Sequence, residues 1–409
     1  MEQRVIELKG LLKELIDGVE PADVLGRFSV DFGSLDPLEL AAAEELLAAE
    51  GTSLGEIQRA NELHTNLTAA RIAKKEPSDR IDLIPGHPAY VFLGENEGLS
   101  KLISDKLDPD LRKYLNSLEE KDRLDLEADA EELINIIKHY DRKENLLFPY
   151  LERAGITVPP QVMWGVDDVI RDLLRLFVKA IKQTPVMPKR IEMIYERLIP
   201  QLESMVVKER DILIPMLDHH MTERDWELVA QESSIIGYVF NKGIEGASNS
   251  DAMTWLKQQS GESISAIETD TAAVSGRVIM PSGDITIDQL TAMLNTLPTD
   301  LTYIDSDNVV RYYSEGKHQV FTRTRTIIGR DVLLCHPPQL IPKIKKLLEE
   351  FRSGAKDYEI VPVKIGSKLN LVRYYAVRNE QGEYMGTVEV TEEMSEILEL
   401  IESRTGSNK

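Results

Sequence analysis

The chain of 409 residues contains one cysteine, Cys335. A single thiol cannot form a disulfide within the chain, and it cannot build a zinc site from several thiolates. Redox chemistry through a cysteine pair is excluded for the same reason. We therefore expect a protein of the reducing cytoplasm.

The chain also lacks long apolar runs and a surplus of positive charge. No stretch approaches the ~20 apolar residues that a membrane span needs, and the amphipathic N-terminus does not have the pattern of a cleaved leader. The 48 Lys and Arg residues are outnumbered by 70 Asp and Glu residues, which gives a net charge of −22. So acidic a chain suits neither nucleic acid nor anionic lipid, and we expect neither as a partner.

Familiar catalytic motifs are missing as well. The sequence has no glycine-rich phosphate loop, no kinase phosphoacceptor segment, and no Ser-His-Asp or Cys-His set with supporting spacing. We therefore predict that the chain is not an enzyme.

Helical spacing of apolar residues dominates the first part of the chain. The pattern continues to about residue 75, with helix ends expected at Gly18 and Gly51 and a capping box at Ser53 and Glu56. Prolines cluster around residue 80 and mark a boundary. We assign residues 1–80 to a short helical domain.

Residues 81–240 carry four longer helical patterns, which predict an antiparallel four-helix bundle. The second and fourth patterns contain the similar segments RKENLLFPYLE and KERDILIPMLD, with Pro149 and Pro215 at matching places. This similarity indicates a duplicated helical hairpin.

The composition and the residue patterns change in the remainder of the chain. Residues 241–282 are polar and rich in Ser and Gly, so we assign them to a linker with some helix. Residues 283–400 contain five β-rich runs with a helical segment after the second, and residues 401–409 are assigned to a disordered tail. The predicted fold class is multidomain: an all-α N-terminal region, then an α+β domain with a five-stranded antiparallel sheet.

Three parts of the sequence resemble known families. The segment HYDRKENLLFP, from His139 to Pro149, resembles the helix motif of hemerythrin-like cation-binding (HHE) domains. Upstream, ELIDGVEPADVLGRF and GTSLGEIQRANELH resemble the helical domain of unknown function 438. Near the C-terminus, IGRDVLLCHPP and VRYYAVRNEQGEYMGTVEV resemble a PAS sensor domain of the subgroup marked by a Cys-His-Pro-Pro turn. These resemblances imply a hemerythrin-like bundle followed by a PAS domain.

A hemerythrin-like bundle holds two irons through several histidines and two carboxylates that point inward from four helices. The first helix of this chain supplies His87 and the second supplies His139. Lys143 stands four residues after His139, where the family places a carboxylate, and Glu144 is one position further on. His87, His139 and Glu144 are the candidate metal ligands that remain.

The third and fourth helices depart further from the family pattern. Asp167 and Arg171 stand where two histidines are expected, and Met205 replaces a third, followed by Glu209 and Arg210. We expect a bundle without a di-iron centre, in which the acidic and basic side chains pair internally. The alternative is one iron or another divalent metal held by the three remaining candidates.

A PAS domain encloses a small cavity between its sheet and short helices. Cys335 and His336 fall on the turn into the helix predicted from Ile341 to Arg352. The resemblance makes them candidate cofactor-binding residues, His336 as a haem ligand or Cys335 as a reactive thiol. In the alternative interpretation, Pro337 and Pro338 begin the helix and the Cys and His pack beneath it.

Three functions remain open. The first is a cytoplasmic sensor or adaptor for a small molecule, a gas or the redox state, without an output domain of its own. Its PAS domain would bind the ligand and form a homodimer. The protein would then act through an unidentified protein partner. The second is an iron protein that handles oxygen or nitric oxide, and the third is a structural protein that forms oligomers.

Overall fold

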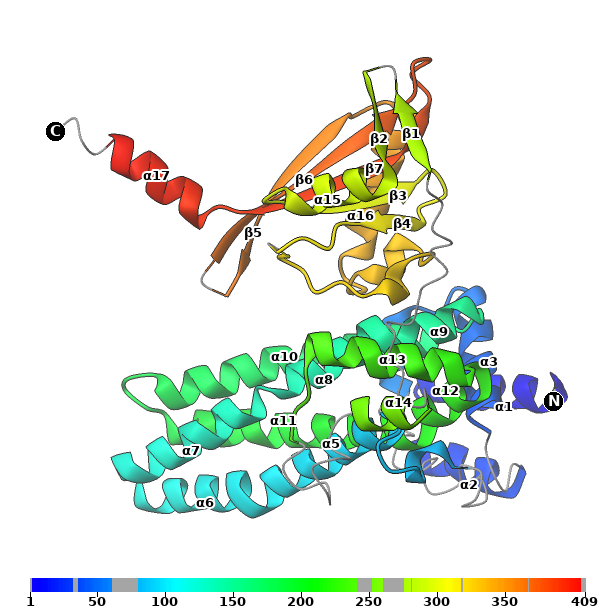
Figure 1. The fold of residues 1–409 in the computed structure, drawn as a ribbon. Helices are drawn as coiled ribbons and strands as arrows, with labels where there is room; N and C mark the ends of the chain where they lie inside the picture. The colour runs from blue at the N-terminus through cyan, green and yellow to red at the C-terminus, as the bar shows by residue number, and fades with distance from the viewer. Residues whose placement is uncertain are drawn as a thin grey trace. The chain divides into compact units, whose positions relative to one another are not determined.

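A computed structural model gives the fold of the chain (Figure 1). It describes residues 2–31, 36–60, 80–240, 252–259, 276–280, 282–317, 319–366 and 368–405. The chain divides into two compact units, Met1–Ser263 and Ile264–Lys409. Each unit is described by itself below.

The first unit begins with the helices α1 (Glu2–Ile16), α2 (Pro21–Asp31) and α3 (Pro37–Ala49). Gly18 and Gly51 follow helices with positive φ angles of 87° and 94°, a conformation that glycine adopts without steric penalty. The expected capping box is present at the start of the next helix, because the Ser53 backbone N–H donates to Glu56 and the Glu56 N–H donates to Ser53 Oγ. Helix α3 packs on α10 (Val158–Lys182) of the bundle, and the apolar side chains of both belong to one core.

Four helical rods form the bundle, as the sequence predicted (Figure 1). The first is α5 (Pro88–Leu102) with α6 (Asp108–Ser117), and the second joins α7 (Glu120–Leu133), α8 (Ile136–Arg142) and α9 (Phe148–Arg153). The third is α10 (Val158–Lys182), and the fourth is α11 (Pro188–Lys208) with α12 (Ile214–His220). Helices α13 (Glu223–Ile236) and α14 (Met253–Gln259) pack against each other, and α13 also packs against α5 and α8.

Three of the rods contain a π-helical turn. These wider turns are Ile103–Leu107, Lys143–Leu147 and Glu209–Leu213, and a proline follows each at the second residue of the next helix. Proline has no backbone N–H, so it interrupts the regular hydrogen-bond ladder at these places. The two similar sequence segments around Pro149 and Pro215 therefore share a local structure, which places Lys143 and Glu209 on corresponding turns.

The second unit contains a five-stranded antiparallel sheet in the order β4-β3-β7-β6-β5. The strands are β3 (Asp300–Asp305), β4 (Val310–Tyr313), β5 (Tyr358–Ile365), β6 (Lys368–Arg378) and β7 (Tyr384–Glu393). Helix α16 (Ile341–Ser353) crosses between β4 and β5 and packs against β7. The structure thus confirms the predicted fold class.

Regular structure is present in the two segments assigned to a linker and to a tail. The segment expected to be a linker with some helix contains α14, whose Trp255 and Leu256 are buried in the core of the first unit. It also contains β1 (Arg277–Met280), which pairs with β2 (Gly283–Thr286) before α15 (Ile287–Thr296). The segment assigned to a disordered tail starts inside helix α17 (Ser395–Thr405).

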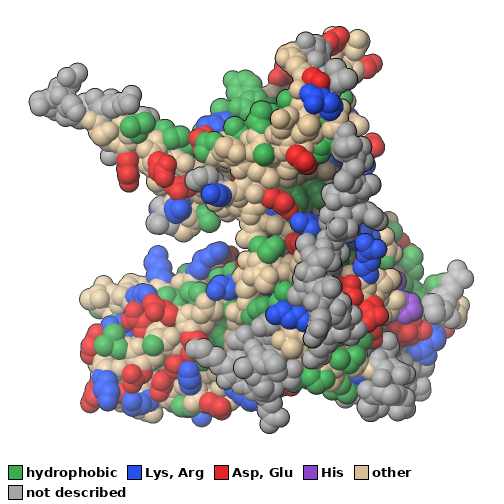
Figure 2. All heavy atoms as spheres, in the orientation of Figure 1, with side chains coloured by type: hydrophobic (Ala, Val, Ile, Leu, Met, Phe, Trp, Pro, Cys, Tyr) green, Lys and Arg blue, Asp and Glu red, His purple; other side chains and the backbone are tan. Residues whose placement is uncertain are grey.

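The surface and the helix lengths are consistent with the composition. Acidic and basic side chains are interspersed over the visible face of the bundle (Figure 2). None of the described helices combines the length and the apolar character that crossing a membrane requires.

Candidate functional site

His139 on α8 lies at the centre of the bundle interior and is fully buried. Its Nδ1 is 2.7 Å from Glu95 Oε2, and its Nε2 is 3.1 Å from Glu209 Oε2. A carboxylate on each side favours an imidazolium that donates both N–H groups. Burial lowers the pKa of His139, but the Glu209 and Glu95 carboxylates outweigh burial and raise it above the usual value.

Lys143, one turn further along the same rod, is also completely buried. Its Nζ donates to Asp167 Oδ1 at 2.8 Å and to Glu209 Oε1 at 2.6 Å, and it lies 4.3 Å from the centre of the Tyr140 ring. Burial raises the pKa of Glu209, but Lys143 and His139 together lower it to about 2. The ammonium group therefore links carboxylates from the third and fourth rods, in the interior where the family pattern expects a metal.

Two arginines complete the interior. Arg171 contacts Glu144 through both terminal nitrogens at 2.8 Å, and Arg142 pairs with Glu95. Burial raises the pKa of Glu144, and the Arg171 guanidinium opposes that rise and favours the carboxylate. We call the resulting set the buried network: Arg142, His139, Lys143 and Arg171 as cations, with Glu95, Glu144, Asp167 and Glu209 as anions. Its charges balance when His139 is protonated.

This donor set does not fit a di-iron centre. Both nitrogens of His139 are engaged by carboxylates, and Lys143 holds two of the carboxylates that iron would need. Within the described part of the chain, no group of three or more His, Cys, Asp or Glu side chains is placed to hold a metal ion. Internal pairing of acidic and basic side chains, expected from the sequence, is what the structure contains. Arg210 does not take part in this internal pairing, because it is half exposed and pairs with Asp211.

His87 lies apart from this interior. It caps the N-terminus of α5, where its Nδ1 accepts the Ala89 N–H at 3.1 Å, and its ring lies 4.9 Å from each of Trp226 and Trp255. Burial lowers the pKa of His87 to about 4. Eight residues of α5 separate it from Glu95, a rise of about 12 Å. The structure therefore does not bring His87, His139 and Glu144 to one point.

Sequence reasoning missed two members of the buried network, Glu95 and Arg142. Glu95 stands at a buried position of the helical stripe that Val91, Phe92 and Leu99 also occupy. A charged residue at an apolar position was the signal that could have revealed it.

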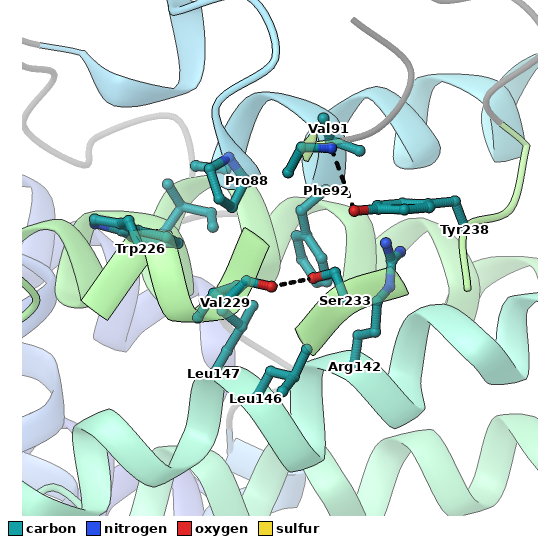
Figure 3. Close-up of a pocket in the computed structure, with 13 residues that line it drawn as sticks. Pro88, Val91, Phe92, Arg142, Leu146, Leu147, Trp226, Val229, Ser233 and Tyr238 are labelled. Carbon is teal, nitrogen blue, oxygen red and sulfur yellow. Dashed lines mark hydrogen bonds between the residues drawn. The ribbon is translucent and has the colours of Figure 1, made fainter. Parts of the chain in front are cut away.

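A small cavity adjoins Arg142 (Figure 3). It has a volume of about 10 Å³, which is room for a single water molecule. Arg142 and Tyr238 both line it, with the guanidinium carbon 4.8 Å from the centre of the Tyr238 ring. Arg142 Nε has no hydrogen-bond partner among the described residues, so a water is the partner that this cavity admits.

The inner face of the sheet in the second unit is polar. Thr302 on β3 lies opposite Glu389 on β7, and Arg323 bridges Asp300 and Glu389, at 2.6 Å from Glu389. Burial raises the pKa of Asp300 although Arg323 opposes it. Asp300 Oδ1 and Thr302 Oγ1 are buried and have no hydrogen-bond partner among the described residues.

His336 and Cys335 lie close to this polar face. His336 Nδ1 donates to the Val332 carbonyl at 2.8 Å, which leaves Nε2 as an acceptor in the neutral ring. Burial lowers the pKa of His336. Arg330 and Arg323 lower it further, whereas Glu389 raises it. Cys335 is half-buried, packs against the small apolar core of this unit, and places Sγ 3.6 Å from the Asp331 carbonyl oxygen.

The two units thus define a hemerythrin-like bundle with preceding helices, and a PAS fold. Family models match the chain in the predicted order: the family of unknown function DUF438 at residues 8–74, the hemerythrin HHE cation binding domain at residues 100–223, and a PAS domain at residues 290–395. The three resemblances stated from the sequence are confirmed.

Solved structures match parts of the chain with low TM-scores. A C-terminal domain from Streptococcus mutans is 30% identical, with 31% of this chain and 98% of that chain covered and a TM-score of 0.29. A sensory box sensor histidine kinase from Vibrio cholerae is 13% identical, with 26% and 89% covered and a TM-score of 0.21. The sensor region of a sensor histidine kinase is 16% identical, with 24% and 40% covered and a TM-score of 0.19. The search of curated proteins found no match.

Proposed function

We propose that the chain is a cytoplasmic sensor or adaptor whose PAS unit binds a small molecule and whose bundle contains no di-iron centre. The observation that carries this proposal is the polar inner face of the PAS sheet. There Asp300 and Thr302 keep buried oxygens without a partner among the described residues, beside the charged Arg323 and Glu389. Buried oxygens of this kind are favourable partners for a polar ligand or for water.

The bundle supports a structural or relay role in this proposal. Among the described residues, His139, Lys143, Asp167 and Glu209 at its centre are joined by ion pairs, so a metal bound there would have to displace Lys143 or break the pairs of His139. An iron protein that handles oxygen or nitric oxide would need the ligands that Lys143 and Arg171 now replace.

Homodimer formation through the PAS unit is part of the proposal. Tyr358 and Ile360 on the edge strand β5 lie opposite Tyr375 and Arg373 on β6, on one face of the sheet. Tyr358, Ile360 and Tyr375 are all exposed large apolar side chains. An exposed apolar patch beside an open sheet edge favours association with a second copy.

Metal analysis and native mass spectrometry of the purified full chain test the proposal. We expect no stoichiometric iron, no oxo-bridged di-iron absorption, and a small molecule retained by the wild type but lost from Thr302→Val. Two tightly bound irons per chain would show that the bundle is the functional centre instead.

His336 and Cys335 are tested in the same preparation. If haem is the retained molecule, His336→Ala should abolish its Soret band while Cys335→Ser should leave the band in place. An unchanged spectrum in His336→Ala would exclude this histidine as the axial ligand.

A further inference from the structure

A groove runs along the helical bundle between α5, α11 and the short turn Ile81–Leu83. It has two adjoining compartments of about 750 and 410 Å³, both within the range of small-molecule pockets. Ser100, Lys101 and Val206 line both compartments. The groove is therefore large enough for an elongated ligand.

Three cationic side chains line the larger compartment. Arg80 Nε donates to Asp82 Oδ1 at 3.0 Å, and Arg210 Nε donates to Asp211 Oδ1 at 2.8 Å, so a neighbouring carboxylate orients each guanidinium. Both arginines use Nε and Nη2 in these pairs, and Nη1 of each has no hydrogen-bond partner among the described residues. Two oriented guanidinium groups and the Lys101 ammonium suit a carboxylate or phosphate group.

The charge of the lining is unusual for this chain. Asp82 and Glu97 are the acidic residues that line the larger compartment, against three basic ones. With Asp211, which pairs with Arg210, the acidic and basic side chains at this place are equal in number, so the site is less acidic than a chain with a net charge of −22 is as a whole.

The rest of the groove has a mixed lining, because Ser104, Asp108, Tyr195 and Glu203 line the smaller compartment beside its apolar side chains. Leu83 at the rim is 49% exposed, and Leu93 and Val206 line the wall. Leu93 and Ile103 on the first rod are ten residues apart, which spans about 15 Å. The apolar lining of the smaller compartment consists of Leu99, Ile103, Ile199, Leu202 and Val206.

We propose that this groove binds a monomeric amphiphilic anion, whose carboxylate or phosphate head contacts Arg80, Arg210 and Lys101 and whose acyl chain extends into the smaller compartment. This site is separate from the PAS ligand of the proposed function and would give the chain a second input.

Asn96 connects the groove to the bundle interior. It is 3% exposed, lines the larger compartment, and donates from Nδ2 to Glu209 Oε2 at 2.7 Å. Glu209 in turn contacts His139 and Lys143. A head group bound in the groove therefore lies beside a side chain that is hydrogen-bonded to the buried network.

Isothermal titration of the full chain with dodecanoate below its micelle concentration tests the site. We expect saturable binding of one molecule per chain. Inorganic phosphate supplies a head without a chain, and dodecyl maltoside supplies a chain without a charged head. Each should bind at least about tenfold more weakly than dodecanoate, because each lacks half of the contacts.

Substitutions separate the two halves of the groove. Arg80→Gln with Arg210→Gln should weaken dodecanoate binding about tenfold or more, and Val206→Trp should weaken it by filling the point where the compartments meet. Arg175→Gln is the matched control, because Arg175 is an exposed arginine paired with Asp172 on α10, away from the groove. Thermal melts of each variant establish that the bundle is intact.

Several results would overturn the proposal. These are an absence of saturable dodecanoate binding, equal affinity in the double arginine variant, or phosphate affinity equal to that of dodecanoate. Binding to phosphatidylglycerol vesicles without binding to monomeric dodecanoate would also contradict it, because the surface would then be a membrane contact.

Discussion

The interiors of the two units handle buried polar groups in different ways. In the bundle, four cations and four carboxylates are paired with one another in the middle of an extensive apolar core. In the PAS unit the fully buried apolar cluster is small, and it consists of Ile304, Val310, Tyr313, Ile327, Val332 and Leu348. Beside that cluster, buried oxygens on β3 have no partner among the described residues. The charges of the bundle interior are mainly paired with one another, although Arg142 Nε and Asp167 Oδ2 have no hydrogen-bond partner among the described residues. The PAS interior has fewer cations beside its buried oxygens, and Arg323 is the one that bridges Asp300 and Glu389.

This difference has a physical origin. Removing a metal from a bundle would leave its carboxylates buried and unpaired, which is strongly unfavourable. Lys143 and Arg171 supply positive charge to Asp167, Glu209 and Glu144 in its place. The bundle can thereby keep its helix arrangement without a metal.

Replacing Lys143 tests most directly whether the buried carboxylates of the bundle depend on their cationic partners. In Lys143→Met, Asp167 loses its ion-pair partner and Glu209 keeps only His139 and Asn96, so we expect a loss of about 3–5 kcal/mol in the free energy of unfolding. Urea denaturation followed by tryptophan fluorescence measures this, because Trp164, Trp226 and Trp255 all lie in the first unit.

The double variant Lys143→Met with Asp167→Leu is the control for this prediction. It removes the orphaned carboxylate together with its partner, and it should recover part of the lost stability. A single variant that loses less than about 1 kcal/mol would mean that water reaches the site and that the network is not closed.

Arg323→Gln tests the polar interior of the PAS unit. Asp300 and Glu389 would lose the guanidinium that bridges them, and we expect a loss of about 3 kcal/mol of local stability. Hydrogen exchange of peptides from β3 and β7, read by mass spectrometry, should show protection reduced by about a hundredfold.

Arg373→Gln is the matched variant on β6. Arg373 pairs with Glu392 at 2.9 Å, and both side chains are more exposed than Arg323 and Asp300, so its effect should be smaller. Equal effects of the two variants would remove the distinction between a polar interior and a solvated sheet face.

The buried position of His87 predicts that the stability of the bundle depends on pH. Because burial lowers the pKa of His87 to about 4, below the usual value of 6.5, the unfolded chain binds a proton that the folded chain does not. The associated stability is present above about pH 6.5 and is lost as the pH falls toward 4. Between pH 7 and pH 5 we expect the wild type to lose about 2 kcal/mol more than His87→Asn, which keeps a side-chain cap for Ala89.

Urea denaturation of both proteins at the two pH values measures this difference. The other carboxylates and histidines titrate in both proteins, so their contributions cancel in the comparison. Parallel pH profiles would show that His87 is as accessible to protons in the folded chain as in the unfolded one.

The rods and strands could be predicted from sequence because their signals are local. Apolar spacing marked the four rods, and β-rich runs between turns marked β3 to β7. The π-helical turns were not foreseen, although the matching segments around Pro149 and Pro215 pointed to a shared structure. The family patterns identified Lys143 and Arg171 as departures from the ligand set.

The partners of those residues could be predicted only in part. Glu95 lies on α5 and meets His139 and Arg142 on α8, 44 and 47 positions away in the sequence. Asp300, Arg323 and Glu389 likewise come from three separate segments. Such contacts depend on how the elements pack, and a single sequence carries no direct signal of that packing.

Arg175→Gln should have the smallest effect, and it tests what burial contributes to an ion pair of the bundle. Arg175 donates to Asp172 at 2.9 Å, about the distance at which Arg171 contacts Glu144, but its side chain is 65% exposed. Water and salt screen this pair, so we expect its removal to change the free energy of unfolding by no more than about 0.5 kcal/mol. Arg171→Gln, four residues earlier on α10, should lose several times more, because Glu144 would be left buried without its guanidinium. Urea denaturation of the two variants in parallel tests burial rather than contact distance as the source of the difference, and equal losses would contradict that explanation.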